Sequence, residues 1–448
     1  MAKRPNVIVF FTDQQRWDTT GLHGNPTGLT PNLDRVAREG THVRNSFTCQ
    51  PVCGPARSSL QTGLYATQTG SVTNGIPLDP SLPTLATWFN EAGYRTGYIG
   101  KWHLAAGEPV PADQRGGYQD WLASNTLEFT SDAYETTMFD ENCEPRRLPG
   151  YRVDALTDAA IRYVDDHQAE PFFLFISYLE PHHQNHRDDY PAPTGYRERY
   201  QGQWMPPDLA ALSGNAVQHW GGYCGMVKRL DEAYGRLLDA LRSLDLLDDT
   251  VVLFTSDHGN HFKTRNGEYK RSLHDGSIRV PTVLTGPGFN GGGEISELVS
   301  LVDLPPTLLD AAGLPVPDNL PGRSLLNLVS RRDTEPWPEE VFVQISESQT
   351  GRAIRTNRWK FGVVAPDTVS PHAAGSEVYH EYALYDLYAD PYELTNLIHL
   401  ESHAELCREL TGRLLAHMAA IGEPPATITP AEKHPSGQRR VEPTEVLA

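Results

Sequence analysis

The segment Asn6-Val-Ile-Val-Phe-Phe-Thr-Asp-Gln14 is an apolar run that ends in polar side chains. Three later segments, at residues 94–103, 172–183 and 251–259, have the same arrangement. Each run has the length and composition of a buried strand, and helix-length amphipathic segments lie between the runs. Strands that alternate with helices predict an α/β fold with a mostly parallel sheet covered on both faces. Because ligands bind beyond the carboxyl ends of such strands, we expect the four polar clusters to meet at one edge of the sheet.

The composition of the chain changes near residue 330, where a polar stretch with two prolines is typical of a linker. Short strand-like runs and one helix-like segment follow it, which is the pattern of a small α+β unit. The last residues are rich in Pro, Glu, Thr and basic side chains, as exposed tails are. We therefore expect a catalytic domain over residues 1–335, a small C-terminal subdomain over 336–421 and a tail over 422–448.

The 448 residues include 57 acidic and 38 basic side chains, which gives a net charge of −19. Nucleic-acid binding requires basic surface, so this balance argues against it, and an anionic substrate would need strong local positive charge. No stretch approaches the roughly 20 apolar residues that cross a bilayer. Only residues 7–11 are apolar near the N-terminus, which is less than the core of a secretory signal. We expect a cytoplasmic protein that does not bind membranes.

The segment Cys53-Gly-Pro-Ala-Arg-Ser-Ser-Leu-Gln-Thr-Gly63 predicts a helix, because Pro55 favours its first turn and Gly63 its end. Cys53 would lie at the helix N-terminus, which favours anions. Arg57, four residues on, is expected to reach the group that Cys53 carries. An ordinary reactive thiolate fits this geometry equally well. The five cysteines are too scattered for a disulfide framework, and no second close pair follows Cys49 and Cys53 to complete a zinc site.

The same segment resembles the modification motif of the type I sulfatases, which the formylglycine-generating enzyme recognises. The matching residues are Cys53, Pro55, Arg57, Leu60, Thr62 and Gly63, while Ala56 replaces a serine that is frequent in the family. Further blocks are similar to family blocks and occur in the same order. They lie at residues 30–34, 100–103, 256–259, 277–281, 352–360 and 384–397.

This resemblance implies the α/β fold of the alkaline phosphatase superfamily, with a C-terminal α+β subdomain that contains an antiparallel sheet. It also implies a hydrolase that cleaves a sulfate monoester of a sugar, aryl or alkyl alcohol. Cys53 would be converted to 3-oxoalanine (formylglycine), whose hydrate is a geminal diol. One hydroxyl attacks sulfur and forms a covalent sulfate ester while the bond between sulfur and the alcohol oxygen breaks. Deprotonation of the other hydroxyl then expels sulfate and restores the aldehyde. The partners implied are a sulfated small molecule or saccharide and the modifying enzyme, and a homo-oligomer is compatible with the sequence.

The resemblance places one divalent cation on Asp13, Gln14, Asp257 and His258, together with the side chain of residue 53. Carboxylate and amide oxygens suit a hard cation, so Ca²⁺ is the first expectation. Many family members have a second acid at position 14 and an amide at position 258. The histidine nitrogen is softer, which makes Mn²⁺ the alternative.

Four more residues match catalytic positions of the family. Lys101 and His103 would contact the sulfate and the diol proton, and on an extended segment both point the same way. His182 and Lys270 would protonate the leaving alkoxide, with His183 as an alternative to His182 because Gln184 replaces a usual proline. The weaker substrate-contact candidates are Asn74, which is also a turn residue, His183 and His274, for which a structural role is equally expected.

Two other functions compete with this interpretation. Phosphonate monoester and phosphodiester hydrolases of the same fold use formylglycine but typically have Tyr and Thr where this chain has Lys101 and His103. A non-catalytic relative would have lost at least one of Cys53, Asp13, Asp257 and Lys101, and none is lost. The alcohol part of the substrate depends on loops that sequence alone does not interpret.

Overall fold

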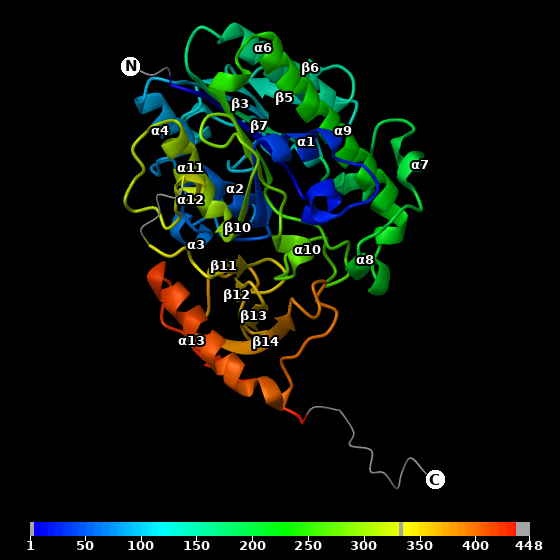
Figure 1. Ribbon diagram of the computed structural model, residues 1–448, viewed down its shortest axis with the longest axis vertical. Coiled ribbons are helices and arrows are strands. Elements are labelled where there is room, and N and C mark those ends of the chain that lie inside the picture. Colours follow the sequence, from blue (N-terminus) through cyan, green and yellow to red (C-terminus); the bar gives the residue numbers. More distant parts are fainter. Residues whose placement is uncertain (1–3, 331–334, 436–448) are drawn as a thin grey trace.

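The four apolar runs form four neighbouring parallel strands in the middle of a ten-stranded sheet. This sheet belongs to the large upper domain in Figure 1. In sheet order they are β8 (Thr250–Ser256), β1 (Asn6–Thr12), β7 (Phe172–Ser177) and β3 (Arg95–Lys101). The computed structural model describes residues 4–330 and 335–435. The predicted α/β fold with a mostly parallel sheet is confirmed.

Six further strands extend the sheet on either side, in the full order β10-β2-β9-β8-β1-β7-β3-β4-β5-β6. On the β8 side, β9 is antiparallel to both of its neighbours, and β4 continues the parallel part beyond β3. The bounds are β2 (Thr41–Phe47), β4 (Asp120–Ser124), β5 (Thr136–Asp140), β6 (Pro145–Leu148), β9 (Val283–Thr285) and β10 (Gly293–Ser300).

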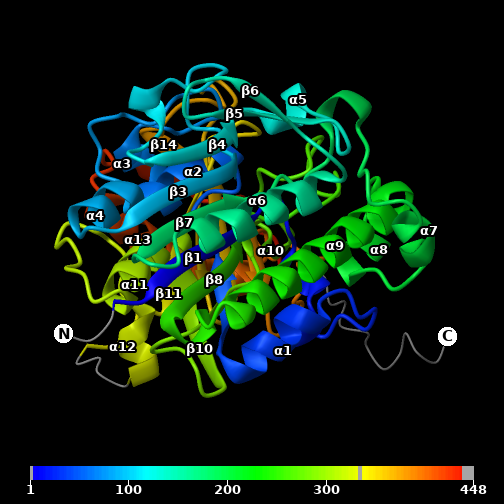
Figure 2. The same cartoon turned by 90° about the horizontal axis from the view of Figure 1, so that it is seen from above.

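Helices cover both faces of this sheet because successive strand side chains point to opposite sides. Val7, Val9 and Phe11 join one buried cluster, whereas Ile8 and Phe10 join the other. Figure 2 shows the two helical layers. The first consists of α2 (Cys53–Thr62), α4 (Leu85–Glu91) and α11 (Leu304–Ala311), and the second of α1 (Pro31–Glu39), α6 (Arg152–Asp166) and α9 (Ala216–Ser243).

Shorter helices connect these layers to the strands. None of the helices among residues 4–330 and 335–435 is both long and apolar enough to cross a membrane. The short helices are α3 (Ala66–Thr69), α5 (Leu127–Thr130), α7 (Tyr196–Tyr200), α8 (Pro207–Ala211), α10 (Asp275–Ile278) and α12 (Leu325–Ser330).

A second, five-stranded sheet and one long helix form the C-terminal unit. Its strands are β11 (Glu340–Ile345), β12 (Gly351–Thr356), β13 (Trp359–Val364), β14 (Val378–Asp386) and β15 (Thr427–Thr429), in that order. The first four are antiparallel, and β15 is parallel to β14. With α13 (Ala404–Ala420), they confirm the small α+β subdomain.

The small sheet lies between α13 and the main domain. On one face, Phe342 packs with Leu410 and Leu414 of α13. On the other face, Val343 packs with Leu273, which lies on the loop between β8 and α10. That loop carries the predicted catalytic residue Lys270, so the small sheet supports part of the predicted site from behind.

The segment assigned to an exposed tail, residues 422–448, begins inside the folded unit. Thr427–Thr429 pair with β14, and Lys433 donates to Glu381. The expectation for this part of the tail is wrong because an edge strand with a free hydrogen-bonding side was available to pair with it. Residues 436–448 lie outside the described residues.

Candidate active site

Cys53 is the first residue of α2 and is 1% exposed. The helix ends at Gly63, which has a left-handed φ of 73° and caps the last turn. The loop from β2 delivers the residue to the carboxyl edge of the sheet, between the ends of β1 and β8. The predicted helix and the position of Cys53 at its start are therefore observed.

Three polar groups surround the Cys53 sulfur. Lys270 Nζ donates to Sγ at 2.8 Å, His258 Nε2 lies 3.2 Å away and Asp13 Oδ1 lies 3.6 Å away. Burial alone would raise the pKa of the Cys53 thiol, but Lys101, Lys270 and His258 together hold it well below its usual range. The site stabilises a negatively charged atom at this position, which is what a nucleophile or a bound oxyanion requires.

Asp13, Cys53, Asp257 and His258 form a group whose potential ligand atoms all lie within 4.8 Å of one another. Asp257 Oδ2 is buried without a hydrogen-bond partner. Burial and the neighbouring Asp13 carboxylate raise the pKa of Asp257 to about 7. Two buried carboxylates this close are stable in their charged forms only beside additional positive charge, which a metal cation would supply.

His258 is oriented as a ligand. Its Nδ1 lies 2.9 Å from the carbonyl oxygen of Gly259 and donates to it, which leaves the Nε2 lone pair on the side of Cys53. A side chain at position 259 would meet the Gly276 carbonyl oxygen at 2.2 Å, so this turn requires glycine. Gln14 adds a fifth candidate ligand, because its Oε1 is buried without a partner. Its backbone N–H binds Asp257 Oδ1 at 2.9 Å.

Arg57 lies in the site but binds the carboxylates rather than Cys53. Its Nη2 donates to Asp13 Oδ2 at 2.9 Å and lies 3.5 Å from Asp257 Oδ2. Its Nη1 donates to the Lys101 carbonyl and to Ser177 Oγ. The expectation that Arg57 reaches the group on Cys53 is therefore not met, because nearer acceptors bind the guanidinium. Arg57 positions Asp13.

Lys101 is fully buried between two carboxylates, with Nζ 2.9 Å from Asp13 Oδ2 and 2.8 Å from Glu128 Oε1. Glu128 comes from α5, and the sequence analysis missed it. Burial alone would raise the pKa of Glu128, but Lys101 and His103 lower it to about 2. A single acid on a four-residue helix carries no local signal, so only the tertiary structure identifies it.

His103 follows Lys101 but does not continue the strand. It has a φ of 61°, so the extended geometry assumed for Lys101 and His103 is wrong. β3 ends at Lys101, and the backbone N–H of His103 binds the Asn125 carbonyl instead. The ring still reaches the site, with Nδ1 3.8 Å from Glu128 Oε1.

His182 and Lys270 are in direct contact, with Nε2 and Nζ 3.1 Å apart. His182 Nδ1 donates to the His183 carbonyl at 2.6 Å, which leaves Nε2 to accept from the lysine. Burial and the charge of Lys270 lower the pKa of His182. The His183 ring lies behind this pair, with its centroid 4.4 Å from that of His182 and 4.3 Å from that of Tyr269. The contacts favour His182 over His183 as the proton carrier.

Asn74 holds the N-terminus of α2. Its Oδ1 accepts from the Gly54 backbone N–H at 2.9 Å, and its own backbone N–H binds Glu347 Oε1 at 2.6 Å. Glu347 lies between β11 and β12 of the small sheet and also pairs with Arg271. Asn74 is therefore a positioning residue, and Glu347 is a second residue that the sequence analysis missed.

His274 is not a substrate-contact residue in this structure. Its Nδ1 lies 3.1 Å from Ser272 Oγ and its Nε2 lies 3.1 Å from the Tyr385 hydroxyl of the small sheet. Both ring nitrogens are thereby used within the protein, so this candidate is corrected to a structural role. A structural role was the other expectation for His274, and its burial against the small sheet agrees with that role.

The comparisons with known proteins agree on one family. The family model described as Sulfatase matches residues 5–314, and the one described as N-sulphoglucosamine sulphohydrolase, C-terminal, matches residues 267–420. An ulvan-active sulfatase of Formosa agariphila is 29% identical over 94% of this chain and 82% of its own length.

Two solved structures share the fold. One, a Bacteroides thetaiotaomicron protein from work on the metabolism of multiple glycosaminoglycans, has a TM-score of 0.81, 22% identity and coverage of 94% of this chain and 97% of its own. The other was solved in complex with its substrate D-glucosamine-2-N,6-O-disulfate. It has a TM-score of 0.76, 24% identity and coverage of 94% and 98%.

Proposed function

The chain belongs to the sulfatase family, and we propose from this premise that it hydrolyses the sulfate ester of a sulfated saccharide through a formylglycine made from Cys53. The observation that carries the proposal is the environment of Cys53, where Lys270 and His258 lie 2.8 and 3.2 Å from Sγ. Once modified, residue 53 would supply a hydrated aldehyde as the nucleophile. The same two side chains would then face its hydroxyl oxygens.

Asp13, Gln14, Asp257 and His258 would hold one divalent cation, for which we propose Ca²⁺, with Mn²⁺ as the alternative. The unpartnered oxygens of Gln14 and Asp257 support an oxygen-preferring ion. The cation would supply Lewis-acid activation of the nucleophile and of the sulfuryl oxygens. Arg57 keeps Asp13 in place for this role, since it binds Oδ2 and leaves Oδ1 facing Cys53.

The balance of charge in the site favours a singly charged ester. The carboxylates of Asp13, Asp257 and Glu128 are matched by the three cations Arg57, Lys101 and Lys270. A divalent cation would leave an excess of about two positive charges. A sulfate monoester carries one negative charge, so the site attracts it in spite of the protein's net charge of −19.

Two histidines are placed to move protons. His182 accepts from Lys270 at Nε2, so the pair would share the proton that the leaving alkoxide oxygen needs. His103 has its Nδ1 3.8 Å from Glu128 Oε1, and this carboxylate would balance the charge of the ring when it takes up a proton. His103 is therefore the candidate to take the proton of the second hydroxyl during release of sulfate.

Relatives support a saccharide as the alcohol part. The Formosa protein acts on ulvan according to its name, and one solved structure contains a sulfated glucosamine as its substrate. Aryl and alkyl sulfates remain alternatives for this chain. Lys101 and His103 favour sulfatase over phosphonate monoester or phosphodiester hydrolase activity, because the latter relatives typically have Tyr and Thr at these positions.

A turnover panel tests the proposal. Protein produced together with the formylglycine-generating enzyme is assayed on sulfated mono- and oligosaccharides, aryl sulfates and phosphodiesters, with the Cys53→Ala variant as the blank. We expect the highest kcat/KM on a sulfated saccharide. A wild-type preference for phosphodiesters would refute the sulfatase assignment, and a preference for aryl sulfates would refute only the saccharide.

A further inference from the structure

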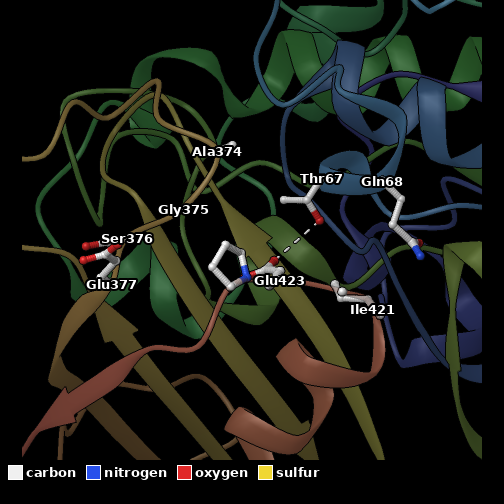
Figure 3. A pocket seen from close by; sticks show the side chains of 10 residues that line it. Thr67, Gln68, Ala374, Gly375, Ser376, Glu377, Ile421 and Glu423 are labelled. Atoms are coloured by element: carbon white, nitrogen blue, oxygen red, sulfur yellow. Dashed lines mark hydrogen bonds between the residues drawn. The ribbon is translucent and has the colours of Figure 1, made fainter.

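Two cavities lie where the small C-terminal unit meets the main domain, and neither includes Cys53 or its neighbours. The first, of about 410 Å³, is bordered by Thr67 and Gln68 of α3, by residues 374–377 and by residues 421–424 (Figure 3). Its central carboxylate, Glu423, already binds Arg352, Gln344 and Thr67. The other charged residue of the lining, Glu377, is also acidic, so this cavity offers no positive charge to an anionic ligand.

The second cavity, of about 510 Å³, is different because three arginines line it. Arg44 lies on β2, Arg279 follows α10 and Arg355 lies on β12. Asp275 is the one acidic residue of the lining, and its carboxylate is shared between Arg355 at 3.5 Å and Lys360. Arg44 pairs with Glu294, which lies outside the lining, at 3.2 Å, so the excess of positive charge in the cavity comes mainly from Arg279.

Arg279 carries most of this excess. Among residues 4–330 and 335–435, no carboxylate oxygen lies within 4.0 Å of its guanidinium nitrogens. Its Nη2 donates only to neutral acceptors, the Arg44 carbonyl and Asn45 Oδ1. Burial and the nearby charges of Arg355 and Arg44 lower the pKa of Arg279 to about 10, in spite of Asp275. Asp275 and Asp18 thus act on Arg279 only from beyond the distance of an ion pair, and its guanidinium has no carboxylate in contact among the described residues.

Aromatic rings hold the two inner guanidinium groups. The Cζ atom of Arg279 lies 4.0 Å from the Trp17 ring centroid, and that of Arg355 lies 4.6 Å from the Phe47 centroid. Stacking fixes the plane of a guanidinium and leaves its N–H groups available at the edge. Arg279 Nη2 and Arg355 Nη1 already donate within the protein, so a sulfate in the cavity would bind the remaining N–H groups of the two arginines through charge-assisted hydrogen bonds.

We propose that this cavity is a second oxyanion site, separate from Cys53, which binds a sulfate group carried by a saccharide. The cavity has room for more than one sulfate ion. The side chain of Tyr388, 71% exposed on its border, offers a ring face against which a sugar packs. Free sulfate has the same charged group, so the test distinguishes the two sources. The proposal does not depend on the chemistry at Cys53.

Equilibrium dialysis tests this site in the full chain with Cys53→Ala, which prevents turnover. The probes are inorganic sulfate, a dextran sulfate oligosaccharide and the same oligosaccharide without sulfate, at low ionic strength so that screening is weak. Arg279→Gln and Arg355→Gln should each weaken binding of the sulfated oligosaccharide roughly 10- to 100-fold, as expected for losing a charge-assisted hydrogen bond. Arg279→Lys keeps the charge but loses the paired geometry, so its loss should be smaller.

Arg242→Gln is the matched control, because this exposed arginine lies on α9, pairs with Asp239 and does not line the cavity. It should bind like the parent chain. Arg44→Gln is a second test at an exposed position, where misfolding is not expected. If the arginine variants lost binding of inorganic sulfate as well as of the sulfated oligosaccharide, free sulfate would be a sufficient ligand for the cavity. Equal binding of every probe by the parent, Arg279→Gln and Arg44→Gln chains would overturn the proposal.

Discussion

Two groups of the main domain each contain two buried aspartates and one buried arginine, but their hydrogen bonds are organised differently. In the first, Arg16 binds Asp18 through Nε and Nη2 and Asp208 through Nη1 and Nη2, at 2.7 to 3.1 Å. In the second, Arg57 binds Asp13 at 2.9 Å and only approaches Asp257, at 3.5 Å.

The difference separates a structural cluster from a site. All four carboxylate oxygens around Arg16 accept a hydrogen bond from it. Asp257 Oδ2 has no hydrogen-bond partner, and Arg57 donates through Nη1 to the Lys101 carbonyl and to Ser177 instead. The carboxylate oxygens of the cluster around Arg16 all have partners within the protein, whereas the group around Arg57 has an unpartnered oxygen, as a candidate metal site does. Burial and charge alone would not have distinguished them.

The largest expected effect is at the nucleophile, where two buried cysteines give a parallel comparison. Burial raises the pKa of Cys49 to about 12, whereas that of Cys53 is lowered. Cys53→Ala should reduce turnover by more than roughly 10⁴-fold while the protein remains folded, and Cys49→Ala should retain turnover within about tenfold. Kinetics and thermal unfolding measure both. Peptide mass spectrometry should find the aldehyde at residue 53 alone, and full activity with an unmodified Cys53 would exclude the formylglycine mechanism.

Asp257→Asn and Asp18→Asn test the two aspartate groups directly. Asp257→Asn removes a negative ligand, so bound metal should fall below one equivalent and turnover by more than roughly 10³-fold. This loss of turnover is larger than the roughly 10- to 100-fold loss expected when a residue that only hydrogen-bonds to a metal ligand is changed. Gln14→Asn should cost less, because it removes no charge.

Asp18→Asn should instead lower the free energy of unfolding by about 3 kcal/mol, since it leaves a buried arginine partly unpaired. Metal per folded chain should stay near one equivalent. Elemental analysis and denaturant unfolding give both readouts. If Asp18→Asn released the metal and Asp257→Asn did not, the distinction between the two groups would be wrong.

Lys101→Ala tests the positive charge between Asp13 and Glu128. Turnover of the sulfate ester should fall roughly 10²- to 10³-fold, as for the loss of one preorganised charge-stabilising donor. Lys101→Tyr combined with His103→Thr should reduce activity on sulfate esters more than any activity on phosphodiesters. The measurement is the ratio of the kcat/KM values for the two substrates. An unchanged ratio would mean that Lys101 and His103 do not cause a preference for sulfate esters.

The smallest effect is expected at Glu347, which reaches the site only through Asn74. Glu347→Gln keeps one acceptor for the Asn74 backbone N–H but weakens the pair with Arg271. Turnover should fall less than tenfold, with the bound metal unchanged. Asn74→Ala, which frees the Gly54 N–H at the start of α2, should have the larger effect of the two. An equal loss in Glu347→Gln and Cys53→Ala would mean that Glu347 acts in the chemistry itself.

The sequence by itself determined the elements that carry local patterns. The four apolar runs predicted β1, β3, β7 and β8, and the helix after Cys53 was marked by Pro55 and Gly63. The residues at or just after the ends of these strands meet around Cys53, because parallel strands end at one edge. They include Asp13, Lys101, His182 and Asp257. The end of a strand is marked by residues that are neighbours in the sequence, so the sequence alone predicts it.

Only the tertiary structure decided which partner each side chain has. Glu128 contacts Lys101 from a helix 27 positions later in the chain, and Asn74 binds Glu347 from 273 positions away. Arg57 binds Asp13 rather than Cys53, His103 departs from the strand, and His274 binds Tyr385. These pairings depend on distances between elements that no periodic pattern encodes. A buried charge takes the nearest available partner, and the packing of the two sheets determines which partner is nearest.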